Sequence, residues 1–276
     1  MRDTRDLGAG AAVAAGAAAT RLATAVPWVA ALLGVVLLVL GAGARGAVAV
    51  VLVVAGAVLV VAGAGAGVAS RLIGSPARLA ARVGGRPVDG VADAGLVSTV
   101  DGLCAVLGVR EPELRVLDDT AANAIVLGAG APTAVLVVTT GLLALLDRIE
   151  LEGLVAHELA HARRGDLERA SAATRALGLV ALTSGAAARL VRTLAGPDRE
   201  SFADLRAVNA TRYPPGLASA LHKIADAPVT RPGGLDTVTA RLTAALWCAP
   251  LEEAVERPPR PGVLDVGERA SALDEL

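Results

Sequence analysis

The chain has 276 residues, of which 54% are hydrophobic and 1% are aromatic, and its mean hydropathy is +0.59. This composition indicates a membrane protein, and the length leaves room for a membrane segment and one further domain. The formal net charge of −1 gives no support to nucleic-acid binding. The two cysteines, Cys104 and Cys248, lie far apart without metal-ligand spacing, so we interpret both as small buried residues and exclude a disulfide framework.

A predicted transmembrane hairpin follows an N-terminal tail, residues 1–21, which fits a flexible segment or a short helix. Residues 22–44 and 46–70 carry no charge, and each is long enough for a hydrocarbon core that needs ~20 apolar residues. Arg45 lies between them. Two buried helices of a soluble domain would show a polar face, and a cleavable signal peptide would not be followed at once by a second span. The hairpin is therefore the favoured interpretation.

The arginines around the hairpin predict its orientation in the membrane. Arginines flank both spans on the side away from Arg45; they are Arg2, Arg5 and Arg21 before the first span and Arg71, Arg78, Arg82 and Arg86 after the second. Basic residues are enriched in cytoplasmic segments that lie close to membrane spans. We therefore expect a multi-pass protein of the cell membrane with Arg45 outside and both ends of the chain in the cytoplasm.

A helix and a small sheet are predicted after the hairpin. Apolar residues recur at roughly helical spacing over 91–107, and Gly108 follows as a C-terminal cap. Three strand-like runs come next, at 114–117, 124–127 and 134–138, with a Gly- and Pro-containing turn between the last two. These patterns predict an α+β domain with a small antiparallel sheet, in which an edge strand could hold an extended peptide by main-chain hydrogen bonds.

The next predicted helix has clear start and stop signals. Asp147 and Glu150 have the spacing of a capping box, and an apolar stripe follows at helical spacing. Gly165 comes directly after two arginines, which suit the C-terminal end of a helix. We therefore predict an amphipathic, half-buried helix over 148–164.

This helix carries the pentapeptide H-E-x-x-H, formed by His157, Glu158 and His161 with two intervening residues. Positions i and i+4 lie on one face of a helix, so the two imidazoles can share one tetrahedral metal ion. Glu158 can then take a proton from a water molecule on that metal. The alternative is a surface helix with two solvated histidines. The chain has only 3 histidines, and two of them lie in this pentapeptide, so a chance placement is less plausible.

A third ligand is expected from the acidic cluster at 198–205. Glu200 and Asp204 are spaced i and i+4, so they share one helix face. Glu200 can ligate the metal while Asp204 accepts the free N–H of a ligating histidine. The alternative is a solvated helix N-terminus whose carboxylates interact with the helix dipole.

Two later segments have less definite patterns. Residues 176–188 are apolar but too few to cross a membrane, so we predict a buried or membrane-surface helix there. Past residue 224 the chain becomes proline-rich, with one further helix predicted over 235–247. His222, the third histidine, is a candidate oxyanion donor, with a plain surface residue as the alternative.

At these motifs the chain resembles the HtpX-like zinc metallopeptidases, the group that includes the CAAX prenyl proteases. The resemblance covers roughly 114–224 well and the hairpin in kind. The similar stretches are Asn123-Ala124, 139–143, 152–166, 199–204 and 213–221, and residues 267–273 resemble the family's C-terminal helix. Two features depart from the family, namely a short segment between the metal motifs and the absence of the His-Pro pair that usually precedes the last helix.

The resemblance implies a gluzincin-like zinc-metallopeptidase domain over 71–249, followed by a proline-rich C-terminal segment with a short helix over 250–276. It implies that the ligands of Zn2+ are His157, His161 and Glu200, and that Glu158 is the catalytic base. Asp204 and Asp166 would support the ligands. The remaining candidates, for the oxyanion or the substrate, are Tyr213, Arg206, His222 and Asn123.

The implied activity is that of a membrane-anchored, zinc-dependent endopeptidase that hydrolyses peptide bonds with a metal-activated water. Its expected partners are the lipid bilayer and a polypeptide substrate, such as a misfolded or membrane protein in quality control, without nucleic acid. Two alternatives remain open, namely a regulatory sensor peptidase that cleaves one repressor and a catalytically inactive membrane scaffold. An inactive copy usually loses a ligand or the base, and this chain retains all of them.

Overall fold

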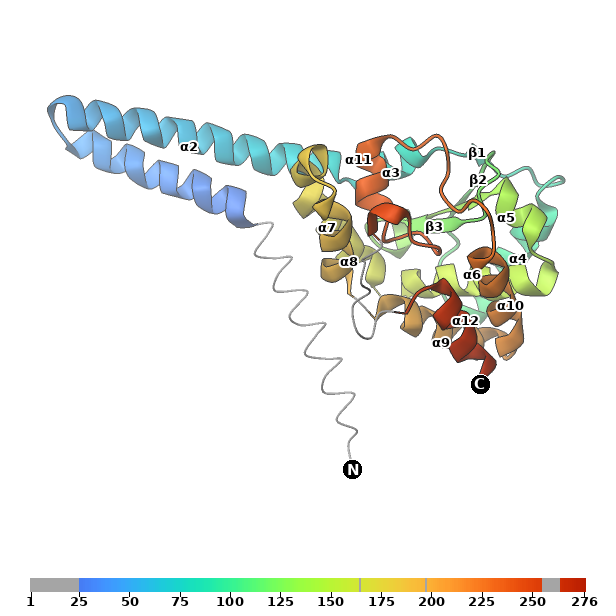
Figure 1. Ribbon diagram of the computed structural model, residues 1–276. Coiled ribbons are helices and arrows are strands. Elements are labelled where there is room, and N and C mark those ends of the chain that lie inside the picture. The colour runs from blue at the N-terminus through green and yellow to red at the C-terminus, as the bar shows by residue number, and fades with distance from the viewer. Residues whose placement is uncertain (1–24, 164, 197, 255–263) are drawn as a thin grey trace.

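The computed structural model describes residues 25–163, 165–196, 198–254 and 264–276. The predicted tail, the first three residues of the first span and much of the proline-rich segment lie outside these ranges. Two helices, Ala25–Gly43 and α2 (Gly46–Ile73), form a hairpin that extends away from the rest of the chain (Figure 1). Both helices are long and apolar enough to cross a membrane, and α2 continues three residues beyond the predicted limit of 70.

Glycines allow the two hairpin helices to approach closely. A Cβ atom added at Gly34 would lie 2.6 Å from the carbonyl oxygen of Gly56, and one added at Gly63 would lie 2.6 Å from that of Pro27. Small residues at such contacts are typical of helix pairs in membranes, where close backbone packing replaces the hydrophobic effect as the cause of association. The outward faces carry exposed valines and leucines, including Val39 and Val61.

The N-terminal hairpin packs against the remaining domain through α7 (Asp166–Thr183). The hydroxyl of Ser70, near the end of α2, donates 2.8 Å to the carbonyl oxygen of Arg175 and lies 3.0 Å from that of Ala176. A Cβ atom at Gly178 would overlap the backbone of Ser70, so only glycine permits this crossing. The helix end is therefore fixed against the domain by backbone contact.

The other elements follow in chain order. They are α3 (Pro76–Val83), β1 (Arg86–Pro87), α4 (Ala94–Leu107), β2 (Glu113–Leu117), β3 (Ala124–Leu127), η1 (Ala131–Thr133), β4 (Val135–Thr139), α5 (Thr140–Leu145), α6 (Arg148–Arg163), α8 (Ala186–Ala195), α9 (Arg199–Thr211), α10 (Pro214–Ala225), α11 (Thr237–Thr243), η2 (Glu252–Ala254) and α12 (Val266–Asp274).

The sheet is mixed rather than antiparallel as predicted. Its strand order is β1-β2-β4-β3, with β2 parallel to β4 and the other two pairs antiparallel. The chain reverses between β2 and β3 but leaves a gap, and β4 inserts there. All five residues of β4 are buried, as expected for a central strand with both edges paired.

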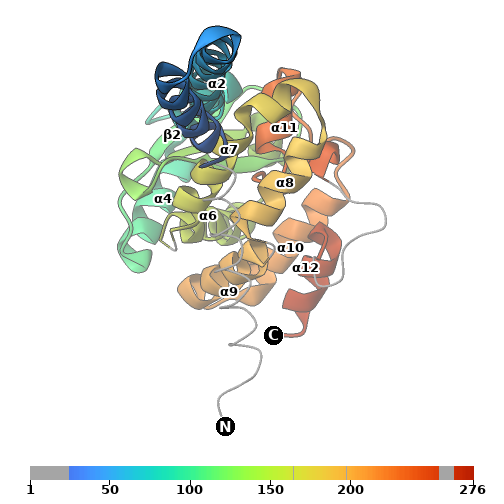
Figure 2. The same cartoon turned by 90° about the vertical axis from the view of Figure 1, so that its left-hand side faces the viewer.

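Side chains that alternate along the strands divide the core between the two faces of the sheet. Val126, Leu136 and Val138 belong to one cluster, with residues of α4, α6, α10 and α12. Ile125 and Val137 belong to the other, with residues of α3, α7, α8 and α11. Figure 2 shows α6 near the centre of the domain, with α9, α10 and α12 at the end remote from the hairpin. The motif helix thus packs directly on the sheet.

Three predicted helices have different limits in the structure. The helix expected over 91–107 begins at Ala94, and Val91 is exposed before it. Residues 176–188 span the end of α7, a turn and the start of α8, because Ser184 adopts an extended backbone that ends α7. The helix expected over 235–247 ends at Thr243, and Trp247 instead forms an antiparallel bridge with Ile125 of β3.

Candidate metal centre

The start of α6 is held in place by a complete capping box. The carboxylate of Asp147 accepts from the backbone N–H of Ile149 and Glu150, and Glu150 Oε2 accepts from the N–H of Asp147 at 2.8 Å. Glu150 also accepts from Ser219 and Lys223 of α10, at 2.6 Å each. These bonds fix the helix against α10 about two turns before the first histidine.

Two buried imidazoles face each other on α6. His157 and His161 are 0% and 1% exposed, and their ring centroids lie 4.9 Å apart. Glu200, from the first turn of α9, lies opposite both rings. Its Oε2 is 3.2 Å from Nε2 of His157, and its Oε1 is 3.7 Å from Nε2 of His161. The ligand atoms of these three residues all lie within 4.8 Å of one another.

This donor set fits a zinc ion. Zn–N and Zn–O bonds of about 2.0–2.2 Å at tetrahedral angles place neighbouring ligand atoms about 3.3 Å apart, and the two Nε2 atoms lie 3.2 and 3.7 Å from the two different oxygens of Glu200. Among the described residues, Glu200 Oε2 has no hydrogen bond although it is buried. Its lone pairs are available to a metal ion, although Arg269 NH1 also lies 3.3 Å away.

Each histidine has a carboxylate on its outer nitrogen. Asp204 Oδ1 lies 2.8 Å from Nδ1 of His157, and Asp166 Oδ2 lies 3.1 Å from Nδ1 of His161. Such partners fix the tautomer and the ring orientation of ligating histidines, leaving Nε2 for the metal. Asp166 is in turn paired with Arg169. The structure thus gives one carboxylate to each histidine.

Arg269 of α12 contacts two carboxylates of the cluster. Its guanidinium donates to both oxygens of Asp204, at 2.7 and 2.8 Å, and its NH1 lies 3.3 Å from Glu200 Oε2. No role for this residue follows from the local sequence patterns. The only sequence feature that points to it is its place in the C-terminal helix that resembles the family. The predicted boundary between the peptidase domain (71–249) and the C-terminal segment (250–276) separates α12 from a site that it contacts. Arg199, which is 4% exposed, donates to Glu200 Oε1 at 2.9 Å.

The charges around the cluster shift the pKa values of its members. Burial alone would lower the pKa of His157, but the Asp204 carboxylate outweighs burial and raises it to about 9. Burial and the nearby Arg199 charge hold the pKa of His161 well below its ordinary value. Burial would raise the pKa of Glu200, but Arg199, the two histidines and Arg269 together outweigh it, and the pKa falls well below the ordinary value. Without a metal ion, the cluster therefore holds an ionised Glu200, a neutral His161 and a protonated His157, whose proton a bound metal ion would displace.

Glu158 is the least satisfied group of the site. It is 1% exposed, and neither carboxylate oxygen has a hydrogen-bond partner among the described residues. Burial raises its pKa to about 7, against an ordinary value of 4.5. A carboxyl group that titrates near neutral pH can accept and return a proton, and such shifts are concentrated at functional sites.

The structure does not bring the three oxyanion candidates to the histidine pair. Tyr213 is 52% exposed, and it lines a small hollow with Ile149 and Thr211. Arg206 is exposed on α9. His222 is exposed on α10, where its Nε2 lies 2.8 Å from Asp274 Oδ2, as its surface alternative predicts.

Asn123 and Cys248 are buried near the site. The side-chain amide of Asn123 bonds to the backbone of Ala249 and Thr230. Cys248 is 1% exposed, as predicted for a small buried residue, but its Sγ also lies within 4.8 Å of ligand atoms of His157 and Glu158. Sequence spacing gives no signal for this contact.

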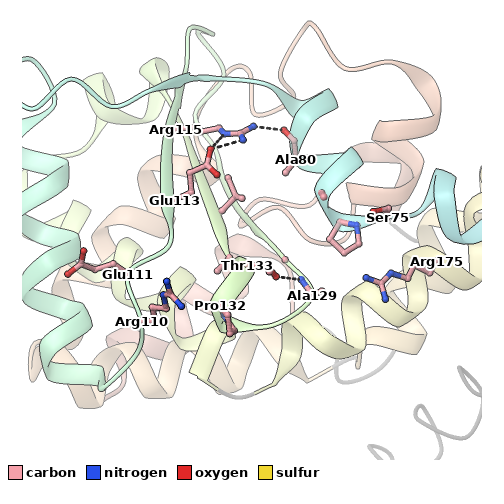
Figure 3. Close-up of a pocket in the computed structure, with 15 residues that line it drawn as sticks. Ser75, Ala80, Arg110, Glu111, Glu113, Arg115, Ala129, Pro132, Thr133 and Arg175 are labelled. Carbon is pink, nitrogen blue, oxygen red and sulfur yellow. Dashed lines mark hydrogen bonds and ion pairs between the residues drawn. The ribbon is translucent and has the colours of Figure 1, made fainter.

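A separate hollow of about 520 Å³ lies between α3, β2 and the β3–β4 turn (Figure 3). Its lining includes Arg110, Arg175 and Arg115, and Arg115 is paired with Glu113. No candidate metal ligand belongs to this lining, so the hollow is distinct from the histidine site.

Comparisons with known proteins agree with this geometry. The model of Peptidase family M48 matches residues 92–227. The protease HtpX homolog of Dictyoglomus thermophilum is 35% identical over 181 residues, which cover 53% of this chain and 59% of the relative. The homolog of Acidiphilium cryptum is 31% identical over 173 residues, covering 52% and 60%. The chain thus spans about 60% of the length of these relatives.

Proposed function

We propose that this chain, which matches Peptidase family M48 over residues 92–227 and is similar to HtpX homologs, is a zinc-dependent endopeptidase anchored by its N-terminal hairpin. His157, His161 and Glu200 would hold the zinc ion. A zinc ion bound there supplies a Lewis acid that lowers the pKa of water and polarises a peptide carbonyl. The further proposal is that its substrates are misfolded or membrane polypeptides, which a hairpin in the bilayer would bring close to the site.

Each residue of the site has a definite task in this proposal. Glu158 accepts a proton from the attacking water and then gives it to the leaving amine, for which its pKa of about 7 is suited. Asp204 and Asp166 keep the two imidazoles oriented, and Arg269 keeps Asp204 in place. Burial excludes bulk water from these groups and strengthens the electrostatic interactions between them.

The observation that carries the proposal is the convergence of two Nε2 atoms and one carboxylate on one point, beside a buried carboxylate that has no partner in the part of the chain that the structure describes. A purely structural cluster would leave no reason for two unsatisfied oxygens on Glu158. This arrangement also argues against an inactive scaffold, because neither a ligand nor the base is missing.

The test uses the full chain purified in detergent. We expect about one zinc ion per chain by metal analysis and chelator-sensitive cleavage of unfolded casein. Glu158→Gln should retain zinc but lose about 10²–10⁴-fold in cleavage rate, because it removes the base and keeps the shape. His157→Ala should lose both metal and cleavage. Cleavage by Glu158→Gln at the wild-type rate would sink the proposed mechanism, and absence of zinc from the wild-type protein would sink the metal assignment.

A further inference from the structure

The outer edge of β3 is occupied by another part of the chain. Trp247 bridges Ile125, and the backbone N–H of Cys248 donates to the carbonyl oxygen of Ala124 at 3.0 Å. Residues 247–249 thus run antiparallel to β3 as a short added strand, which we call the strap. This edge lies beside α6, since β3 contacts that helix. An extended substrate that adds to the edge would compete with the strap for the same main-chain groups.

The strap also reaches the chemical groups of the site. Sγ of Cys248 and ligand atoms of His157 and Glu158 lie within 4.8 Å of one another. The carbonyl oxygen of Cys248 accepts a hydrogen bond from Arg269 NH1 at 3.1 Å. Both carboxylate oxygens of Glu158 are buried and unpartnered among the described residues, and this carboxylate lies beside the Cys248 thiol. A thiol therefore lies where a scissile bond must approach the proposed base.

Asn123 fastens the strap at its far end. Its Nδ2 donates to the carbonyl oxygen of Ala249 at 2.8 Å, and its Oδ1 accepts from the N–H of Ala249 at 3.0 Å. One side chain thus reproduces the pair of bonds that a neighbouring strand would make. Asn123 directly precedes β3, so its side chain extends the hydrogen bonding between β3 and the strap by one residue.

From these contacts we propose that the strap is an autoinhibitory segment, which occupies the substrate's place on β3 and holds Cys248 against Glu158 until a polypeptide displaces it. The proposal rests on the proposed peptidase function and adds its regulation. The described form is then latent, and an extended chain opens the site by exchanging its own main-chain hydrogen bonds for those of the strap.

Locking the strap gives a reversible test. In an antiparallel ladder that pairs Ile125 with Trp247, the next pair is Ala124 with Cys248. This pair makes one of its two ladder bonds, from the Cys248 N–H to the Ala124 carbonyl oxygen, and Cα atoms of facing antiparallel residues lie about 4.5–5.5 Å apart, within the range of disulfides. Ala124→Cys should therefore form a disulfide with Cys248 when treated with diamide, as mass analysis would verify. The oxidised protein should keep its zinc and its thermal unfolding midpoint.

The oxidised Ala124→Cys protein should cleave casein at least about tenfold more slowly than the same sample after reduction, a ~1.4 kcal/mol effect. Wild-type protein treated in the same way should not change, because Cys104 and Cys248 are both buried and far apart in the sequence. A verified disulfide with undiminished cleavage would overturn the strap proposal and leave the peptidase intact. Failure of both the reduced variant and the wild-type protein to cleave would overturn the peptidase function and the strap with it.

A second measurement does not depend on turnover or on the new cysteine. Maleimide labelling of Glu158→Gln protein, resolved by mass analysis of the two cysteine peptides, reports opening at Cys248 with Cys104 as the internal control. Saturating casein should accelerate labelling of Cys248 about tenfold, again a ~1.4 kcal/mol change, without affecting Cys104. Equal acceleration at both thiols, or casein binding without acceleration at Cys248, would contradict displacement of the strap.

Asn123→Ala removes two hydrogen bonds that hold the strap. It should label faster at Cys248 without casein, because two hydrogen bonds to Ala249 are lost. Asn209→Ala is the matched control, since Asn209 is exposed on α9 and bonds only to its own helix among the described residues. An unchanged Cys248 labelling rate in Asn123→Ala would show that these bonds do not hold a strap.

Discussion

Arg269 and Asp204 form a bidentate pair, with Nε 2.8 Å from Oδ2 and NH2 2.7 Å from Oδ1. Both side chains are buried, at 2% and 6% exposure. Burial would raise the pKa of Asp204, but the charges and hydrogen bonds of Arg269 and His157 together outweigh it and lower the pKa to about 2. Because Asp204 also contacts Nδ1 of His157, the last helix of the chain acts on a candidate ligand through one carboxylate.

The first prediction concerns this carboxylate. Asp204→Asn preserves size but removes the charge that orients and polarises His157. We expect about 10–100-fold weaker zinc binding, the usual effect of losing such a partner, together with a lower unfolding midpoint, because the buried Arg269 loses its charged partner. Competition with a chelator of known affinity measures the change. Asp198→Asn, at the N-cap of the same helix, is the control, because no side-chain cap bond is lost there. Equal zinc affinities of the two variants would contradict the orienting role.

The second prediction concerns Arg269 itself. Arg269→Met fills a similar volume but leaves Asp204 as a buried charge without its main partner. Breaking one side of a buried ion pair costs about 3–5 kcal/mol, so the unfolding midpoint in detergent should fall clearly. Adding Asp204→Asn to Arg269→Met should recover part of that loss, because the unpaired charge is then gone. If the double variant is no more stable than Arg269→Met, the pair is not the reason for the loss.

Local sequence patterns predict the parts of this site that are close in the chain. The i, i+4 spacing places His157 and His161 on one face of α6, and Asp147 with Glu150 predicts its first turn. Glu200 and Asp204 share a face of α9 for the same reason. These relationships depend on helical geometry alone, which a sequence shows directly.

Contacts between distant segments are not visible in such patterns. Arg269 lies 112 residues from His157, and Asn123 lies 126 residues from Ala249. The insertion of β4 between β2 and β3 is likewise not visible locally, because β3 and β4 are both fully buried apolar runs. Helix limits failed where tertiary contacts outweighed propensity, as at Trp247, which pairs with β3 instead of continuing α11.

The third prediction concerns acid stability through Glu150. Burial would raise its pKa, but hydrogen bonds from Lys223, Ser219 and Asp147 outweigh burial and lower it from the ordinary 4.5. A carboxyl group with a lower pKa in the folded state stabilises the fold above its unfolded pKa. That stabilisation is lost as pH falls through the folded value. The wild-type protein should therefore lose stability below about pH 4.5 partly through this group.

Glu150→Gln should remove this pH dependence. At pH 7 the variant should be less stable by about 1–2 kcal/mol, because bonds to a buried charge contribute about 1.5–3 kcal/mol and the half-exposed Lys223 is screened by water. At pH 3 the difference should shrink. Thermal unfolding of both proteins at the two pH values measures it, and a constant difference would show that Glu150 is not the titrating group.

The fourth prediction concerns the junction between the hairpin and the domain. Gly178→Val adds a side chain where a Cβ atom would overlap the backbone of Ser70. Overpacking of this kind typically costs about 1–3 kcal/mol, and the Ser70 hydroxyl bonds to α7 should be disturbed as well. Gly185→Ala is the control, because no atom lies within 4 Å of a Cβ atom there. Equal unfolding midpoints for the two variants would contradict the close crossing of α2 and α7.

The last prediction concerns membrane orientation. Arg71, in the last turn of α2, lies 5.0 Å from the ring centroid of Trp28 in the other hairpin helix, so both mark the end of the hairpin that adjoins the domain. Trp is enriched at membrane interfaces, and basic residues accumulate on the cytoplasmic side. Arg45 is the single charged residue between the two helices. We therefore expect the domain to be cytoplasmic and Arg45 external.

A cysteine at position 45 should react with a membrane-impermeant maleimide in intact cells, whereas one at Leu276 should react only after permeabilisation. Labelling of the Leu276 position in intact cells would reverse the assignment and place the candidate metal centre outside the cytoplasm.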